Sequence, residues 1–244
     1  MSADGGSGTP PLAVQRAILL AALAGTVVAS WFYVITSADH GMGAAHADVP
    51  VALPVWAAMM TGMMLPGAAP MFTAYLRVNH RNGGRWEPLA AFVLAYLTLW
   101  IAVSLLGASA QQGLMAAGLI SPTGASTRPL LSAAVLLIAG IYQFTPLKQA
   151  CLWRCRTPLG FILTEWRPGA LGALRMGWIH GQECILCCWA LMALMFVLGS
   201  MNLLGMALLT ILMLVEKAAP AGAAIGRWGG ALLIGSGLVV ALAR

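Results

Sequence analysis

Charged side chains are scarce in this sequence. Aspartate, glutamate, lysine and arginine together make up 8% of its 244 residues, against roughly 25% in an average soluble domain. An ordinary globular protein is therefore excluded. Hydrophobic residues make up 60%, and several apolar runs reach the roughly 20 residues that a helix needs to cross a bilayer. The period-two alternation of a transmembrane β-barrel is missing, so we predict an all-α, polytopic transmembrane helical bundle.

Motifs of the common soluble enzymes are also missing. The sequence has no nucleotide-binding loop, no zinc-protease motif and no hydrolase elbow. No loop is long enough to hold an ATPase domain, which excludes a self-powered pump. The net charge of +6 could indicate a nucleic-acid partner, but the basic residues lie in loops between apolar runs, as in membrane proteins. We therefore expect the lipid bilayer, and no nucleic acid, as a partner.

The apolar runs predict seven spans behind a short tail. We expect residues 1–12 to be a disordered N-terminal tail and residues 13–244 to form a single transmembrane helical domain. The long run 178–215 is interrupted by Gly199, Ser200, Met201 and Asn202, and we divide it into a tight hairpin. The predicted spans are 17–35, 51–75, 89–106, 130–147, the two halves of 178–215, and 223–243.

The basic residues indicate how these spans are oriented. With seven spans, 11 of the 13 lysines and arginines fall on one side, and only Arg128 and Arg244 fall on the other. Cytosolic loops of membrane proteins carry such an excess of positive charge. The N-terminus is therefore predicted to be cytosolic and the C-terminus external.

Three cysteines lie at helical spacing in the fifth span. Cys184, Cys187 and Cys188 occupy positions i, i+3 and i+4, and His180 lies one turn earlier. Side chains at these spacings share one face of a helix, so they could offer two or three sulfurs to one ion or take part in thiol exchange. Thiolates and thioethers are soft ligands, which favour Cu(I) over hard ions. The ordinary alternative is that these cysteines are small buried hydrophobes.

Two further cysteines follow the fourth span. Cys151 and Cys155 are i and i+4 if a helix continues beyond Pro146. They belong to the longest predicted cytosolic loop, 148–177, where tryptophans interleaved with arginines indicate a short helix on the membrane surface. In a reducing cytosol both thiols should be free to bind a metal. They could equally be incidental residues of a polar loop.

Methionines are the other soft ligands in the sequence. Their thioethers could line a route for an ion, or they could fill the core, because methionine packs adaptably. Of the 14 methionines, the candidates in the second span are Met59, Met60, Met63 and Met64, and those that continue the cysteine face of the fifth span are Met192 and Met195.

A few charged or polar residues add to this picture. Glu183 adjoins Cys184, and a carboxylate within the membrane usually has a function and a partner. The pair Glu216–Lys217 at the end of the sixth span could be merely interfacial. In the first external loop, His40 and His46 could collect a metal, although a flexible polar loop explains them as well.

Three motifs together resemble a bacterial family of predicted metal-binding integral membrane proteins of unknown function, often labelled copper chaperones. This resemblance implies a multi-pass protein of the bacterial inner membrane that associates with copper. The motifs run from Trp56 to Met71, from Tyr142 to Pro158, and from Gly181 through Met195 to Lys217.

The leading hypothesis is a membrane protein that binds Cu(I) through cysteine and methionine and hands it to a metal-donor or metalloenzyme partner protein. The same residues permit a membrane thiol–disulfide oxidoreductase that passes electrons between the two cysteine groups. A non-catalytic assembly subunit of a metalloenzyme, with structural cysteines, is a third possibility. Transport across the membrane is a fourth, because methionines reach its midplane.

Overall fold

The computed structural model describes residues 10–39, 48–83, 85–200 and 202–243. This part of the chain is built from ten helices without a β-strand, which confirms the predicted all-α class. The predicted tail, 1–12, lies mostly outside the described residues, and its last residue already begins α1. The helices are α1 (Leu12–Asp39), α2 (Val49–Arg81), α3 (Trp86–Ala116), α4 (Pro129–Tyr142), α5 (Pro146–Arg156), α6 (Pro158–Glu165), α7 (Gly169–Ala193), α8 (Met195–Leu198), α9 (Leu203–Ala218) and α10 (Gly222–Leu242).

Five helical segments of the described chain are long and apolar enough to cross a membrane, namely α1, α2, α3, α7 with α8, and α10. The bent pair α4 and α5 raises this number to six if it counts as one crossing. These lengths and compositions are those of a helical membrane protein. The predicted count of seven includes α9, which has 16 residues. That count and the predicted orientation remain predictions.

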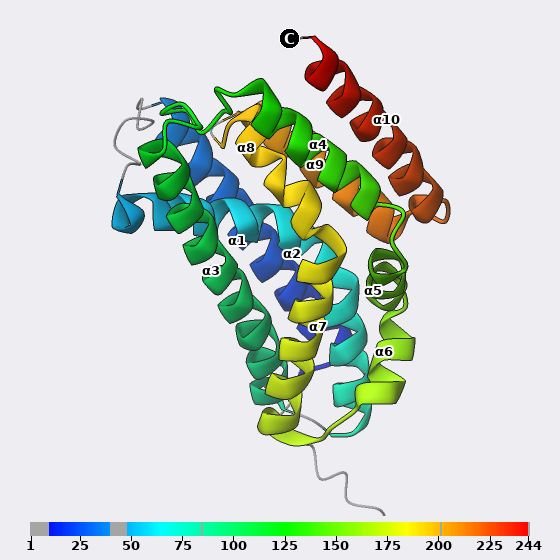
Figure 1. The fold of residues 1–244 in the computed structure, drawn as a ribbon. Coiled ribbons are helices and arrows are strands. Elements are labelled where there is room, and N and C mark those ends of the chain that lie inside the picture. Colours follow the sequence, from blue (N-terminus) through cyan, green and yellow to red (C-terminus); the bar gives the residue numbers. More distant parts are fainter. Residues whose placement is uncertain (1–9, 40–47, 84, 201, 244) are drawn as a thin grey trace, which may run out of the picture.

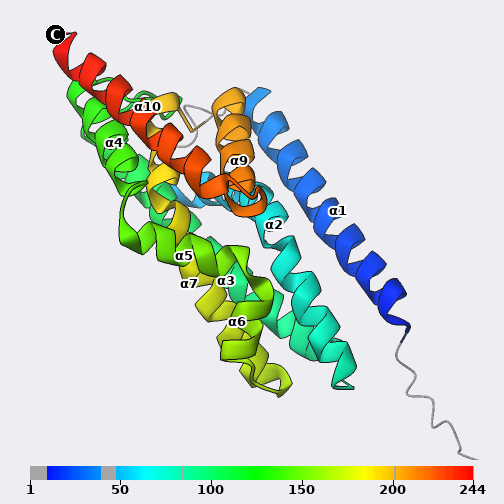
Figure 2. The ribbon, with the colours of Figure 1, turned by 90° about the vertical axis from the view of Figure 1, so that its right-hand side faces the viewer.

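Helices α2, α3 and α7 form the centre of the bundle, and α1 lies along the outer side of α2 (Figures 1 and 2). Helix α2 contains Pro54, Pro66 and Pro70, and it changes direction along its length (Figure 1). Membrane helices tolerate such prolines because neighbouring helices and local adjustments satisfy the freed carbonyls. Where α7 meets α3, a Cβ on Gly177 would lie 2.2 Å from the Phe92 carbonyl oxygen, so only glycine permits this close approach.

The predicted fourth span, 130–147, is wrong at its C-terminal end. Helix α4 ends at Tyr142, and α5 starts at Pro146 at an angle of 63° to it. Proline at the first helical position lacks an N–H that would have no partner there anyway. Thr145 caps the new helix, because its hydroxyl accepts a hydrogen bond from Lys148 N (3.3 Å). Pro146 therefore starts a helix instead of stopping one.

The loop after the fourth span contains α5 and α6, two short helices where one surface helix was expected. Helix α6 packs on α2 and buries Phe161 and Ile162. The predicted break near 199–202 separates α8 from α9. Gly199 has φ +96° there, a left-handed conformation that favours glycine.

Helix α10 packs chiefly on α4, at the edge of the bundle (Figures 1 and 2). Gly222, Gly226 and Gly230 repeat at every fourth position and are buried. A Cβ on Gly230 would lie 2.9 Å from the Gly140 carbonyl oxygen. Such small residues let membrane helices approach each other closely.

A buried ion pair joins α5 to α9. Lys148 Nζ lies 2.7 Å from Glu216 Oε2, and their side chains are 1% and 2% exposed. At the other end of α5, the Arg156 guanidinium donates hydrogen bonds to the carbonyl oxygens of Ala219 (2.6 Å) and Pro220 (2.9 Å). These contacts fix the short helix α5 against the C-terminal end of α9.

The Gly177 contact can be tested by mutation. We expect Gly177→Ala to destabilise the protein by about 1–3 kcal/mol, because α3 and α7 would have to separate to admit the methyl group. Gly113→Ala on α3 is the matched control, since nothing lies within 4 Å of its added Cβ. Thermal unfolding in detergent should show a loss for the first variant only. Equal melting temperatures would contradict the close approach.

The Lys148–Glu216 pair can be tested with a double-mutant cycle. We expect Lys148→Met to cost about 3–5 kcal/mol, because it leaves the Glu216 carboxylate buried without its base. Adding Glu216→Leu should recover most of that loss, since both charges are then gone. Equilibrium unfolding in mixed micelles gives the free energy of unfolding of Lys148→Met, of Glu216→Leu and of the double variant. Losses that simply add would show that the two side chains do not interact.

Candidate metal centre

Helix α7 gathers three thiols at the middle of the bundle. Cys184, Cys187 and Cys188 lie on the face of α7 that points into the bundle, and each side chain is 1% exposed. The predicted shared face is therefore present and faces protein, not lipid. All five cysteines are free thiols.

The sulfur of Cys184 is the point where the other helices converge. Lys217 Nζ from α9 donates a hydrogen bond to it at 3.1 Å, and the Tyr96 hydroxyl from α3 lies 3.3 Å away. Helix α5 packs on α7, and its Cys155 interacts electrostatically with Cys184 and Cys187. Helices α3 and α9, both distant in sequence, thus meet α7 at one sulfur atom, and α5 lies beside it.

The remaining two thiols of α7 form hydrogen bonds with a backbone carbonyl of the same helix. Cys187 Sγ and Cys188 Sγ donate hydrogen bonds to the Cys184 carbonyl oxygen at 3.1 Å and 3.0 Å. Cys188 Sγ also lies 3.9 Å from Met64 Sδ on α2. We call Cys155, Cys184, Cys187, Cys188 and Met64 the sulfur cluster.

Both cysteines of α5 are buried, with 7% exposure for Cys151 and 8% for Cys155. They lie at i and i+4 of a regular helix, as the sequence had predicted for a helix beyond Pro146. Cys155 belongs to the sulfur cluster. Cys151 interacts electrostatically with Cys187, so it lies at the periphery of the same group.

The predicted methionines divide into two sets. Met64 belongs to the sulfur cluster and also lies 4.0 Å from Lys217 Nζ. The structure buries the others in the core, and their predicted role as ligands stays a prediction. These are Met59, Met60, Met63, Met192 and Met195.

His180 lies one turn before Cys184 in a pocket of aromatic rings. Its ring is stacked against Tyr96 (5.5 Å between centroids) and Phe92 (6.2 Å), and Phe161 meets it edge-on (5.7 Å). It is 2% exposed, and neither ring nitrogen has a hydrogen-bond partner among the residues that the structure describes. Buried polar atoms are normally satisfied, so His180 retains two unused ligand or proton sites beside the thiols.

Charged residues near the cysteines are paired across helices. Glu183 forms an ion pair with Arg154, which also binds Glu165 at 3.0 Å. Lys217 and Tyr96 were not among the predicted site residues. The adjacent opposite charges of Glu216 and Lys217 within an apolar run were the available signal, because such a pair in a membrane helix needs partners. Nothing in the sequence indicated Tyr96.

The side chains of the sulfur cluster are not arranged as a ready set of metal ligands. Among the described residues, no three histidine, cysteine, aspartate or glutamate side chains are arranged to hold a metal. The thiols of Cys187 and Cys188 are engaged with a backbone carbonyl, so they would have to rotate before they could serve as ligands. The donors are nevertheless soft and buried, and this chemistry fits a soft metal ion.

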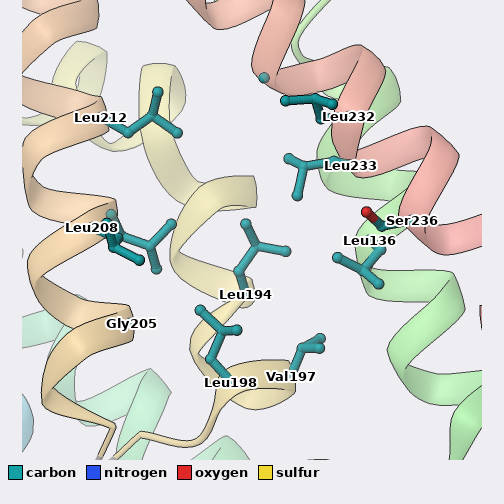
Figure 3. A pocket seen from close by; sticks show the side chains of 12 residues that line it. Leu136, Leu194, Val197, Leu198, Gly205, Leu208, Leu212, Leu232, Leu233 and Ser236 are labelled. Atoms are coloured by element: carbon teal, nitrogen blue, oxygen red, sulfur yellow. The ribbon is translucent and has the colours of Figure 1, made fainter.

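A separate cavity of about 350 Å³ lies among α4, α8, α9 and α10 (Figure 3). It is lined mainly by leucines, including Leu194 and Leu232, and Ser236 is its one polar side chain. No cysteine or titratable residue faces it.

The histidines of the first loop, His40 and His46, lie outside the described residues.

Comparison with known proteins agrees with this chemistry. The family PpoB2, described as a copper chaperone, matches residues 53–240. No curated protein and no solved structure matches the chain. The matched residues cover most of the sequence and contain all five cysteines, so the chain belongs to the PpoB2 copper chaperone family.

Proposed function

We propose that this protein binds Cu(I) within the membrane and hands it to another protein. Membership of a copper chaperone family suggests the metal. The observation that carries the proposal is the position of Cys184 Sγ, which is contacted by groups of α3 and α9 and lies beside the cysteines of α5. Thiolate and thioether ligands favour the reduced ion Cu(I), and burial protects it from water.

The proposed ligands of the resting site are Cys184 and Cys188, with Met64 as a weaker thioether ligand, and Cys155 takes the ion over in the transfer step. Cu(I) accepts two or three sulfur ligands, so rotation of the Cys188 thiol away from the Cys184 carbonyl would complete the site. The thiols lose their protons when the metal binds. His180 could supply a nitrogen in place of one sulfur.

The transfer step is assigned to α5 in this proposal. Cys151 and Cys155 are the more exposed of the five cysteines, and Cys155 lies beside the buried thiols on a helix that is separate from α4 and α7. Exchange of Cu(I) between Cys155 and Cys151 would move the ion away from Cys184. The remaining buried methionines of α2 and α7 would provide a soft lining, and a metal-donor or metalloenzyme protein would be the partner.

The charge distribution supports a location in the bacterial inner membrane with α5 on the cytosolic side. Arg154, Arg156 and Lys148 all belong to α5, and basic residues accumulate on the cytosolic side of membrane proteins. The reducing cytosol would keep the thiols ready for metal.

Removal of the α7 thiols tests the proposal directly. We expect the wild-type protein, purified in detergent, to bind close to one equivalent of Cu(I) in competition with a chromophoric chelator. The variant Cys184→Ser/Cys187→Ser/Cys188→Ser should retain no more than a background level, because hydroxyl groups are poor ligands for a soft ion.

The matched control is Met176→Leu. Met176 is buried on the same helix, but it is not a proposed ligand, and leucine nearly conserves its volume. This variant should bind Cu(I) like the wild type. Unchanged binding in the triple serine variant would rule out the site.

A second candidate function is thiol–disulfide exchange, which is favoured by the proximity of the Cys155 thiol to those of Cys184 and Cys187. Oxidation of two thiols to a disulfide would release two protons and pass two electrons to an acceptor disulfide, which becomes a dithiol. A disulfide between Cys155 and Cys184 would also remove one proposed copper ligand and the thiol assigned to the transfer step.

The two functions differ in how the protein responds to a disulfide substrate. For the copper function, we expect oxidised glutathione to produce no catalytic turnover of the wild type, and Cys155→Ser to weaken Cu(I) binding without abolishing it. Mass spectrometry after alkylation would detect a bond between Cys155 and Cys184. Rapid formation of that bond with turnover of the substrate would favour the oxidoreductase.

A further inference from the structure

The side chain of Lys217 reaches the sulfur cluster along α2. A Cβ on Gly67 of α2 would lie 3.1 Å from Lys217 Cδ and 3.5 Å from its Nζ. Glycine at this position therefore leaves space for the lysine stem. The stem delivers the ammonium to Cys184 Sγ, 3.1 Å away, and to Met64 Sδ, 4.0 Å away.

The neighbouring carboxylates already have their own bases. Glu216, next to Lys217 in the sequence, binds Lys148, and Glu183, next to Cys184, binds Arg154. Within the described chain, Lys217 forms no salt bridge with a carboxylate. A buried charge requires a compensating partner, and the group to which the Lys217 ammonium donates is the Cys184 sulfur.

We propose that Lys217 makes the sulfur cluster selective for monovalent soft ions. This inference rests on the proposed function. When a metal binds Cys184 and Cys188, both thiols give up their protons to solvent, and no electron is transferred. The two thiolate charges are then balanced by the ammonium together with a monovalent ion. A divalent ion would leave an uncompensated positive charge inside the protein, where the dielectric constant is low.

The ligands alone do not make this distinction. Cysteine thiolates bind Zn(II) as well as Cu(I) in other sites. Without the ammonium, two thiolates would be neutralised by a divalent ion. The fixed charge of Lys217 therefore determines which class of thiophilic ion the cluster retains.

The test uses Ag(I) as a redox-stable monovalent ion and Cd(II) as a thiophilic divalent ion. Both are titrated into the full-length protein in detergent, and competing chelators give the ratio of their affinities. For Lys217→Gln we expect the ratio of Cd(II) to Ag(I) affinity to rise roughly tenfold or more, because a charge close to the metal is removed. Lys217→Arg keeps the charge and should keep the wild-type ratio.

Arg227→Gln is the charge-matched control. Arg227 is an exposed basic residue near the start of α10 with no contact to the sulfur cluster. Arg227→Gln changes the net charge as Lys217→Gln does. Because Arg227 does not contact the sulfur cluster, this variant should leave the ratio unchanged. If it shifts the ratio equally, the effect is one of overall charge, and the inference is overturned.

A second variant keeps the test valid if Lys217→Gln does not fold. Gly67→Val would push the lysine stem away from the thiols while the charge remains in the chain, and it should raise the same ratio. If the folded variants still bind Ag(I) and the ratio is unchanged, the role of Lys217 is overturned but the proposed function is not. Failure of the wild type to bind either Ag(I) or Cu(I) would instead overturn the proposed function.

Discussion

The site depends on the buried ion pair between Lys148 and Glu216. It anchors α5 to the C-terminal end of α9. Helix α5 has 11 residues, and its axis is bent away from that of α4. The same contact sets the position of Cys155 on one helix and of Lys217 on the other. Two charges in a dry interior are costly unless they face each other, so the pair specifies one arrangement of these helices.

Much of the architecture could be predicted from local patterns. Apolar runs predicted helices that cross a membrane, the glycine at 199 predicted the break before α9, and the spacing of Cys184, Cys187 and Cys188 predicted one shared face. These features depend on helical geometry within one segment. Family membership, which the three motifs had suggested, was likewise confirmed.

The predictions that failed concern features that depend on contacts between segments. The bend before Pro146 was missed because proline can end a helix or begin one, and the Thr145 cap decides between them. The role of Lys217 was missed because its partners, Cys184 and Met64, come from helices far away in sequence. A pattern of single residues does not reveal which of the six candidate methionines will meet a thiol.

The order in which the chain is synthesised gives the Glu216–Lys217 dipeptide a further significance. All five cysteines leave the ribosome before these two residues do. Until α9 follows, α5 lacks its anchor and the thiols lack their neighbouring ammonium. The nascent protein therefore holds its thiols without the ammonium and the ion pair that organise them, and only completion of α9 supplies both to the sulfur cluster.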